Sequence, residues 1–372
     1  MLGECRTDRE IMDRTKDSTK VFTLLSQLLL AVDENKSSEE ISRTATNWSR
    51  EEFGMLWGLA NSHHVILRTF PRLYQSMLVE RNERADWVDL TIAKEQARVH
   101  HALSFLSPIC EALRDLGEVI VIKSLDHWPD LGSDLDLYTR GEAADVVAIM
   151  RQRFKAKVAA RSWGDRLANK WNFIVPGLPE LVEVHIGRLG QTGEQVAITE
   201  SLGTRGSFAR FGSHLFRVPA AEDRLIISTL QRMYRHFYIR LCDVADTTQL
   251  VESGVVDYVY LHSLARSAGL WDGLATYLTI VSGYVQSYRR QGLPLPQQVR
   301  STARFGNERI SFRQRFLRIP IFPQAASLYV SEWERLVLNG ELQNALRLSL
   351  LPGLAAAAAL ELKITGSDKG IW

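Results

Sequence analysis

The chain has 372 residues, a formal net charge of +2, 45% hydrophobic residues and 24% charged residues. This composition is typical of a globular protein with a substantial core, and it excludes collagen-like, strongly disordered and polycationic chains. The small net charge produces no overall field that would attract a long nucleic acid.

Cysteine use and the N-terminal residues bear on the cellular compartment. Cys5, Cys110 and Cys242 lie far apart and lack the spacing of metal ligands, which favours a reducing compartment. The first residues are charged and lack the apolar core of a signal peptide, and no apolar run is long enough to span a membrane. We therefore expect a cytoplasmic protein without membrane contact, and the sequence leaves the oligomeric state open.

The first 115 residues are expected to be helical. Apolar residues recur at helical spacing and predict helices over residues 21–32, 51–60, 65–78 and 90–116. Pro71 and Pro108 lie inside the last two of these helices and are expected to bend them.

The pattern changes after Gly117. Short β-branched or alternating runs predict strands over residues 118–122, 134–138, 157–160, 171–175 and 181–186, with a helix over 142–154. A polar, glycine-rich segment follows from residue 187 to residue 212. Further helices are predicted from residue 222, with one continuous apolar stripe, and over 258–268, 274–289, 325–338 and 342–360.

These elements predict an α+β fold in which a small mixed β-sheet is flanked by helical regions on both sides. We expect an N-terminal helical region over residues 1–115, a sheet-containing core over 116–218 and a C-terminal helical domain over 219–372.

Three acidic residues in the predicted strands are the strongest functional signal. Asp134 and Asp136 are two residues apart and therefore project from the same face of their strand. Glu183 lies in a second alternating strand, so the three carboxylates converge if the two strands are neighbours. Such a group holds divalent ions that neutralise charge during phosphoryl or nucleotidyl transfer. The alternative is that these acids form the solvated face of an antiparallel sheet.

The motifs around these acids resemble the nucleotidyltransferase superfamily of the DNA polymerase beta type, and within it a family of uncharacterised bacterial nucleotidyltransferases. The resemblance covers about residues 115–285. It rests on Ile122-Lys123-Ser124, the turn Gly132-Ser133, the strand Asp134-Leu135-Asp136-Leu137, the strand Val182-Glu183-Val184-His185, and a later segment from Arg232 to Val244.

The resemblance implies that Asp134, Asp136 and Glu183 are catalytic and hold two Mg²⁺ ions, with Mn²⁺ as an alternative. It implies transfer of a nucleoside monophosphate from an NTP such as ATP to a hydroxyl group. Small sugars, antibiotics, protein side chains and tRNA 3′ ends all suit this chemistry as acceptors. Two other functions remain open: a catalytically silent nucleotide-binding or protein-interaction module, and a nuclease or phosphohydrolase.

Several polar residues near the acids are candidates for nucleotide binding: Lys123, Ser124, Gly132, Ser133, Arg166 and Lys170. Each also has an ordinary structural explanation, such as turn formation or a solvated charge. The same two interpretations apply to His185 and to a row predicted on one helix, Arg232, His236 and Asp243.

Overall fold

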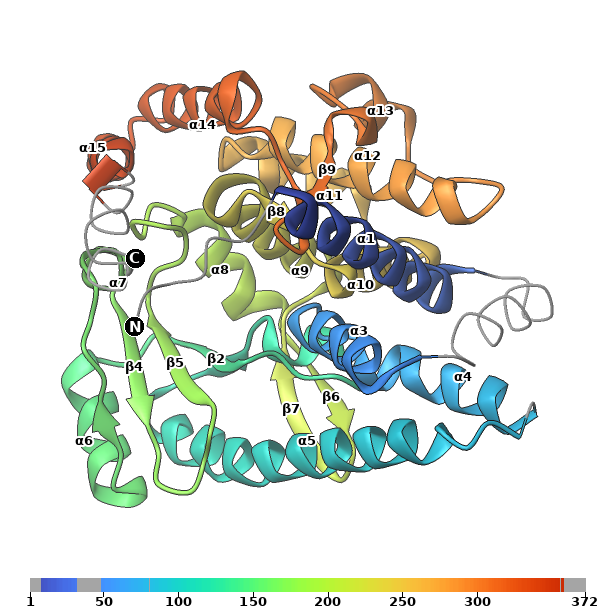
Figure 1. Ribbon diagram of the computed structural model, residues 1–372. Coiled ribbons are helices and arrows are strands. Elements are labelled where there is room, and N and C mark those ends of the chain that lie inside the picture. The colour runs from blue at the N-terminus through green and yellow to red at the C-terminus, as the bar shows by residue number, and fades with distance from the viewer. Residues whose placement is uncertain (1–7, 32–47, 80, 355, 358–372) are drawn as a thin grey trace.

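The computed structural model describes residues 8–31, 48–79, 81–354, 356 and 357, and side chains from residue 18 onward within these ranges. The chain forms a mixed α+β fold in which small sheets lie among many helices (Figure 1), which confirms the coarse fold class. Cys5 lies outside the described residues. Within them, no helix combines the length and the apolar character needed to cross a membrane.

The predicted N-terminal helices are present. They are α1 (Asp8–Leu30), α3 (Arg50–Ser62), α4 (Ile66–Val79) and α5 (Ala85–Leu113). Pro71 and Pro108 lie inside α4 and α5, as expected. Ser49 begins α3 with a capping box, because its side chain and that of Glu52 satisfy each other's backbone N–H groups.

A five-stranded sheet forms the centre of the fold. Its spatial order is β1 (Val119–Val121), β2 (Asp134–Thr139), β5 (Leu181–Ile186), β4 (Lys170–Ile174) and β3 (Lys157–Val158). Strands β2 and β5 are parallel, and the other neighbours are antiparallel. The connections contain η2 (Ser124–His127), α6 (Ala143–Phe154) and α7 (Trp163–Leu167).

The two faces of the sheet differ in chemistry. Helices α5 and α6 cover one face (Figure 1), where Leu135, Leu137, Val182 and Val184 are buried with them in one hydrophobic core. The acidic residues of β2 and β5 therefore project from the opposite face, toward the C-terminal helices. Helices α1, α3 and α4 share a second core with those C-terminal helices, so the two flanking helical regions pack together.

The glycine-rich segment after β5 contains regular structure that the sequence did not predict. Helix α8 (Val196–Arg205) is followed by the hairpin of β6 (Ser207–Phe211) and β7 (His214–Val218). Ile198 and Leu202 are four residues apart and fully buried. Tertiary burial of this short apolar stripe outweighs the low helix propensity of the surrounding residues.

The single helix predicted from residue 222 is wrong in one respect. The segment consists of α9 (Ala221–Thr229), the wider helical turns of η3 (Leu230–His236), β8 (Tyr238–Ile239) and α10 (Leu241–Glu252). Phe237 has a left-handed backbone with φ of 54° and ends the first part. The Asp243 carboxylate accepts the Arg240 N–H at 2.6 Å and caps the start of α10.

The remaining helices agree with the prediction, and several short elements were not predicted. The chain continues through α11 (Tyr258–Ser267), α12 (Trp271–Tyr288), α13 (Gln297–Thr302), η4 (Asn307–Arg309), β9 (Ser311–Arg313), β10 (Phe316–Arg318), η5 (Ile321–Ala325), α14 (Ala326–Leu338) and α15 (Leu342–Ser349). Strand β10 pairs with both β8 and β9. Residues 355 and 358–360 of the last predicted helix lie outside the described residues.

Candidate active site

The parallel pairing of β2 with β5 brings the predicted acids together. Asp136 lies directly opposite Glu183 in the register of the two strands. Ligand atoms of Asp136, Glu183 and His185 all lie within 4.8 Å of one another. Burial and the nearby carboxylates of Asp136 and Glu183 raise the pKa of Asp134 to about 6. The structure therefore places all three acids in one group.

Lys123 and His185 both lie beside the same oxygen of Glu183. The Lys123 ammonium forms an ion pair with Asp136, and its Nζ lies 3.4 Å from Glu183 Oε1. The His185 Nε2 lies 2.8 Å from the same Glu183 oxygen. Burial lowers the pKa of Lys123, but the carboxylates of Asp136 and Glu183 outweigh this and raise it, which keeps Lys123 charged.

Lys170 lies on the far side of Glu183 and is also buried. Its Nζ is 2.9 Å from Glu183 Oε2 and 2.9 Å from Asp165 Oδ1. Burial raises the pKa of Glu183, but Lys123, His185 and Lys170 outweigh this and hold it well below its usual value. Lys170 thus keeps Glu183 ionised, and it is not among the residues that line the cavity described below.

Ser124 and Ser133 have different roles beside the acids. The Ser124 hydroxyl accepts the backbone N–H of Asp136 at 2.7 Å and donates to the carbonyl of Asp134 at 3.0 Å. It therefore fastens the loop before η2 onto β2. The Ser133 hydroxyl donates to the Asp134 carboxylate at 3.3 Å, and Gly132 and Ser133 both line the cavity.

Arg166 does not join the group. It is exposed on α7, and its guanidinium carbon lies 5.6 Å from the centre of the Trp163 ring. Trp163 is 61% exposed, so the two side chains form a surface pair. Arg166 does not line the cavity, which leaves its predicted role in nucleotide binding without structural support.

A cavity of about 170 Å³ opens over the acids. One wall carries Asp134, Asp136 and Glu183. The opposite wall carries cationic and polar side chains from the helical regions: His64, Gln231, Arg232, Arg235, His236 and Arg240. Burial, together with the neighbouring arginines, lowers the pKa of His64 and His236 well below the usual value, so both imidazoles are neutral near pH 7. Carboxylates on one wall of the cavity thus lie opposite guanidinium groups on the other wall.

Only part of this wall was predictable from the sequence. The predicted row is split: Arg232 and His236 line the cavity, whereas Asp243 forms an ion pair with Arg232 at 2.7 Å. The concentration of basic residues between 232 and 240 was a signal for Arg235 and Arg240. No local signal marks His64, because it comes from the connection between α3 and α4.

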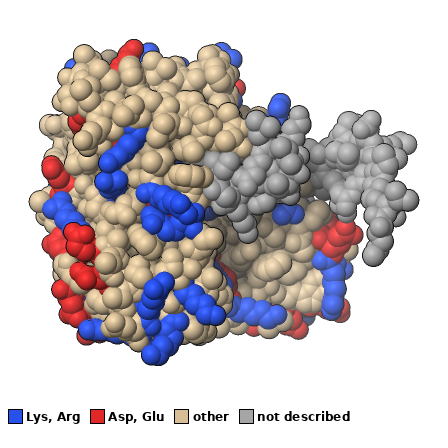
Figure 2. Space-filling view, turned by 90° about the vertical axis from the view of Figure 1, so that its left-hand side faces the viewer, with Lys and Arg blue, Asp and Glu red and all other residues tan. Residues whose placement is uncertain are grey.

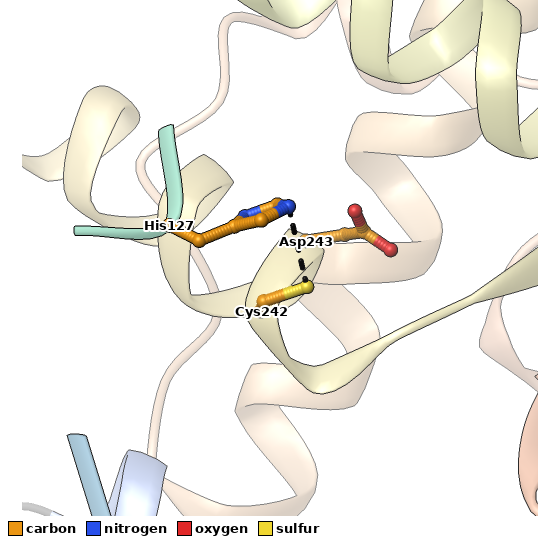
Figure 3. Close-up of side chains that lie close together, drawn as sticks. All are labelled: His127, Cys242 and Asp243. Carbon is orange, nitrogen blue, oxygen red and sulfur yellow. Dashed lines mark hydrogen bonds between the residues drawn. The ribbon is translucent and has the colours of Figure 1, made fainter. Parts of the chain in front are cut away.

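His127, which also lines the cavity, lies close to Cys242 and Asp243 (Figure 3). The His127 ring faces the Cys242 sulfur, with Nε2 and Sγ 3.8 Å apart. The His127 Nδ1 is 2.5 Å from the Asp246 carboxylate, and Asp243 is already bonded to Arg232 and to the Arg240 N–H. Because these groups satisfy one another, we interpret the cluster as structural and not as a metal centre.

The N-terminal helices hold the loop between β1 and β2 in place. The Asp130 carboxylate accepts the N–H groups of Leu67 and Arg68, at 2.8 and 3.1 Å, at the start of α4. Arg98 of α5 donates to the Leu131 carbonyl at 3.0 Å and pairs with Glu180 at 2.6 Å. These contacts fix the turn that leads into Asp134.

The acidic group has the chemistry of a magnesium site. Its donors are carboxylate oxygens, which Mg²⁺ prefers. Among the described residues, Asp134 has no cationic ion-pair partner, and burial together with the carboxylates of Asp136 and Glu183 raises its pKa. Asp134 and Asp136 would therefore hold the metal.

No known protein family, curated protein or solved structure matches this chain.

Proposed function

We propose that this protein is a magnesium-dependent nucleotidyltransferase that transfers a nucleoside monophosphate from an NTP to a hydroxyl acceptor and releases pyrophosphate. One observation carries the proposal. The register of β2 and β5 brings Asp136 opposite Glu183 and beside Asp134, at a cavity whose other wall carries Arg232, Arg235 and Arg240.

In the proposed reaction, the acceptor oxygen bonds to the α-phosphorus, and the bond from that phosphorus to the oxygen bridging the β-phosphate breaks. Pyrophosphate leaves with that oxygen. The hydroxyl proton passes to water, because the cations around Glu183 lower its pKa and make it a weak base. Bound magnesium supplies charge neutralisation at the phosphate oxygens. Arg232, Arg235 and Arg240 hold the β- and γ-phosphates.

The fold of the sheet supports this assignment. The turn Gly132-Ser133, the two aspartates of β2 and a third acid on a later strand are the features on which the resemblance to the DNA polymerase beta-type superfamily rests, and the parallel pairing of β2 with β5 supports it. We propose that the five-stranded sheet is a nucleotidyltransferase core of that type.

The surface and the thiols bear on the acceptor and the compartment. On the face shown in Figure 2, lysine and arginine side chains form several separate groups instead of one continuous track. This favours a small acceptor over a long nucleic-acid strand, which needs many phosphate contacts. Cys110 and Cys242 are buried free thiols, which supports a reducing, cytoplasmic setting.

The test is incubation with each labelled NTP and Mg²⁺ against pools of metabolites, tRNA and protein. The wild type is expected to label an acceptor, and Asp136→Ala to lose about a hundredfold or more of that activity, as expected for loss of a metal ligand. Asp145→Ala, on the exposed face of α6, is the matched control and should label like the wild type. Equal labelling by wild type and Asp136→Ala would refute the proposed function.

A further inference from the structure

Lys123 has an unusual backbone conformation at the end of β1. Its φ of 62° and ψ of −59°, together with a 2.6 Å hydrogen bond from the Ser124 N–H to the Ile122 carbonyl, define a γ-turn with positive central φ. This conformation is strained for a non-glycine residue and persists only where its surroundings hold it. Here the Ile122 N–H donates to the Asp136 carbonyl at 3.0 Å. The turn thus places the lysine beside β2.

The side chain that this turn presents occupies a defined place among the acids. The Lys123 ammonium bonds to Asp136 and lies 3.4 Å from Glu183 Oε1, so both carboxylates are its partners. The side chain is only 12% exposed. An Mg²⁺ ion shared by Asp136 and Glu183 would lie about 2.1 Å from their oxygens. The ammonium already lies between these two carboxylates, and both cations do not fit there.

Both oxygens of Glu183 already have partners within the chain. Oε1 faces His185 and Lys123, and Oε2 faces Lys170 at 2.9 Å. Asp134 differs, because among the described side chains its carboxylate contacts only the Ser133 hydroxyl, at 3.3 Å. The negative charge without a partner therefore lies at Asp134 and at the second oxygen of Asp136, whose contact is the Ser124 hydroxyl at 3.4 Å.

We infer that the Lys123 ammonium is a built-in cation that fills the position between Asp136 and Glu183, and that the chain consequently binds one divalent ion, through Asp134 and Asp136. The inference rests on the proposed function, which requires a metal at these acids, and it revises the expected number of ions from two to one. Lys123 then neutralises the acids on the Glu183 side of the site in place of a second ion.

The first test counts bound Mn²⁺ on the full chain by electron paramagnetic resonance. The wild type is expected to bind one ion, and Lys123→Met, which keeps the length of the side chain without its charge, is expected to bind two. Lys157→Met, in the exposed edge strand β3, is the matched control and should bind one. Two ions on the wild type, or one on Lys123→Met, would overturn the inference and leave the proposed function standing. If neither protein binds an ion, both the inference and the proposed function are overturned.

A second test uses only the wild type and so does not depend on the folding of a variant. The rate at which acetic anhydride modifies Lys123 is measured by mass spectrometry with and without Mn²⁺. A lysine that stays between the two carboxylates is protected equally in both conditions, so a ratio of about one is expected. A several-fold faster modification with Mn²⁺ would mean that the metal displaces Lys123, which contradicts the inference.

Discussion

Arg68 and Asp246 form a buried ion pair in which Nη1 and Oδ1 are 2.6 Å apart. The pair joins α4 of the N-terminal region to α10 of the C-terminal region. Asp246 also bonds to His127 of η2, and Arg68 donates to the Trp128 carbonyl at 2.9 Å. Through these two side chains, both helical regions hold the loop that follows Lys123 and Ser124.

Asp246→Asn should destabilise the protein by about 3–5 kcal/mol, because it leaves Arg68 and His127 buried without their anion. Urea denaturation measures the free energy of unfolding. Asp115→Asn is the control, since Asp115 pairs with Arg153 at 3.0 Å on the surface and should change stability by less than about 1 kcal/mol. Similar losses in both variants would show that Asp246 is not a central anchor.

His127 should make stability depend on pH. Burial lowers its pKa, but Cys242 and Asp246 outweigh burial and raise it well above the usual value. A raised pKa means that the folded state binds the proton more tightly than the unfolded state. The stabilisation is therefore complete below about pH 6.5 and is lost as the pH rises toward the folded-state pKa. The difference in unfolding free energy between wild type and His127→Gln should shrink from pH 6 to pH 9, and a constant difference would contradict this assignment.

Asp134→Asn should stabilise the protein at pH 7.5 by about 1 kcal/mol or more, because it removes a carboxylate whose ionisation is opposed first by burial and then by repulsion from Asp136 and Glu183. The pKa of Asp134 is raised to about 6, so its ionisation opposes folding once the pH exceeds the unfolded-state value. The gain should therefore grow between about pH 4 and pH 6 and stay constant above that range. Thermal unfolding across this pH range measures the gain in stability. An Asp134→Asn variant that is less stable than the wild type at pH 7.5 would contradict this assignment.

Arg235→Ala should weaken NTP binding by about 10- to 100-fold, which is the usual scale for a charged hydrogen bond to phosphate. Arg235 lines the cavity, and none of the carboxylates in the described ranges pairs with it, so its loss should leave stability nearly unchanged. Isothermal titration with ATP and the other NTPs in the presence of Mg²⁺ gives the affinity. Arg266→Ala, on the exposed side of α11, should bind like the wild type. Unchanged affinity in Arg235→Ala would remove this residue from the phosphate site.

The strands and most helices were predictable because their signals are local. The alternation in residues 134–138 and 181–186 fixed which side chains share a face, and the structure confirms that Asp134, Asp136 and Glu183 face away from the core of Leu135 and Val184. The interruption of the predicted helix after His236 and the presence of helix α8 were not predicted. There the outcome depends on strand pairing and burial by distant segments, which no local pattern contains.

The sequence by itself determined the three acids, the turn before them and their placement on two strands, because a two-residue period sets side-chain direction regardless of the rest of the fold. Only the tertiary structure decided which cations meet those acids. Lys123 reaches Glu183 from the turn after β1, Lys170 reaches it from β4, and Arg166 stays on the surface. The electrostatics of the site depend on distances between side chains that are remote in the chain, and these exist only once the sheet and the helices have packed together.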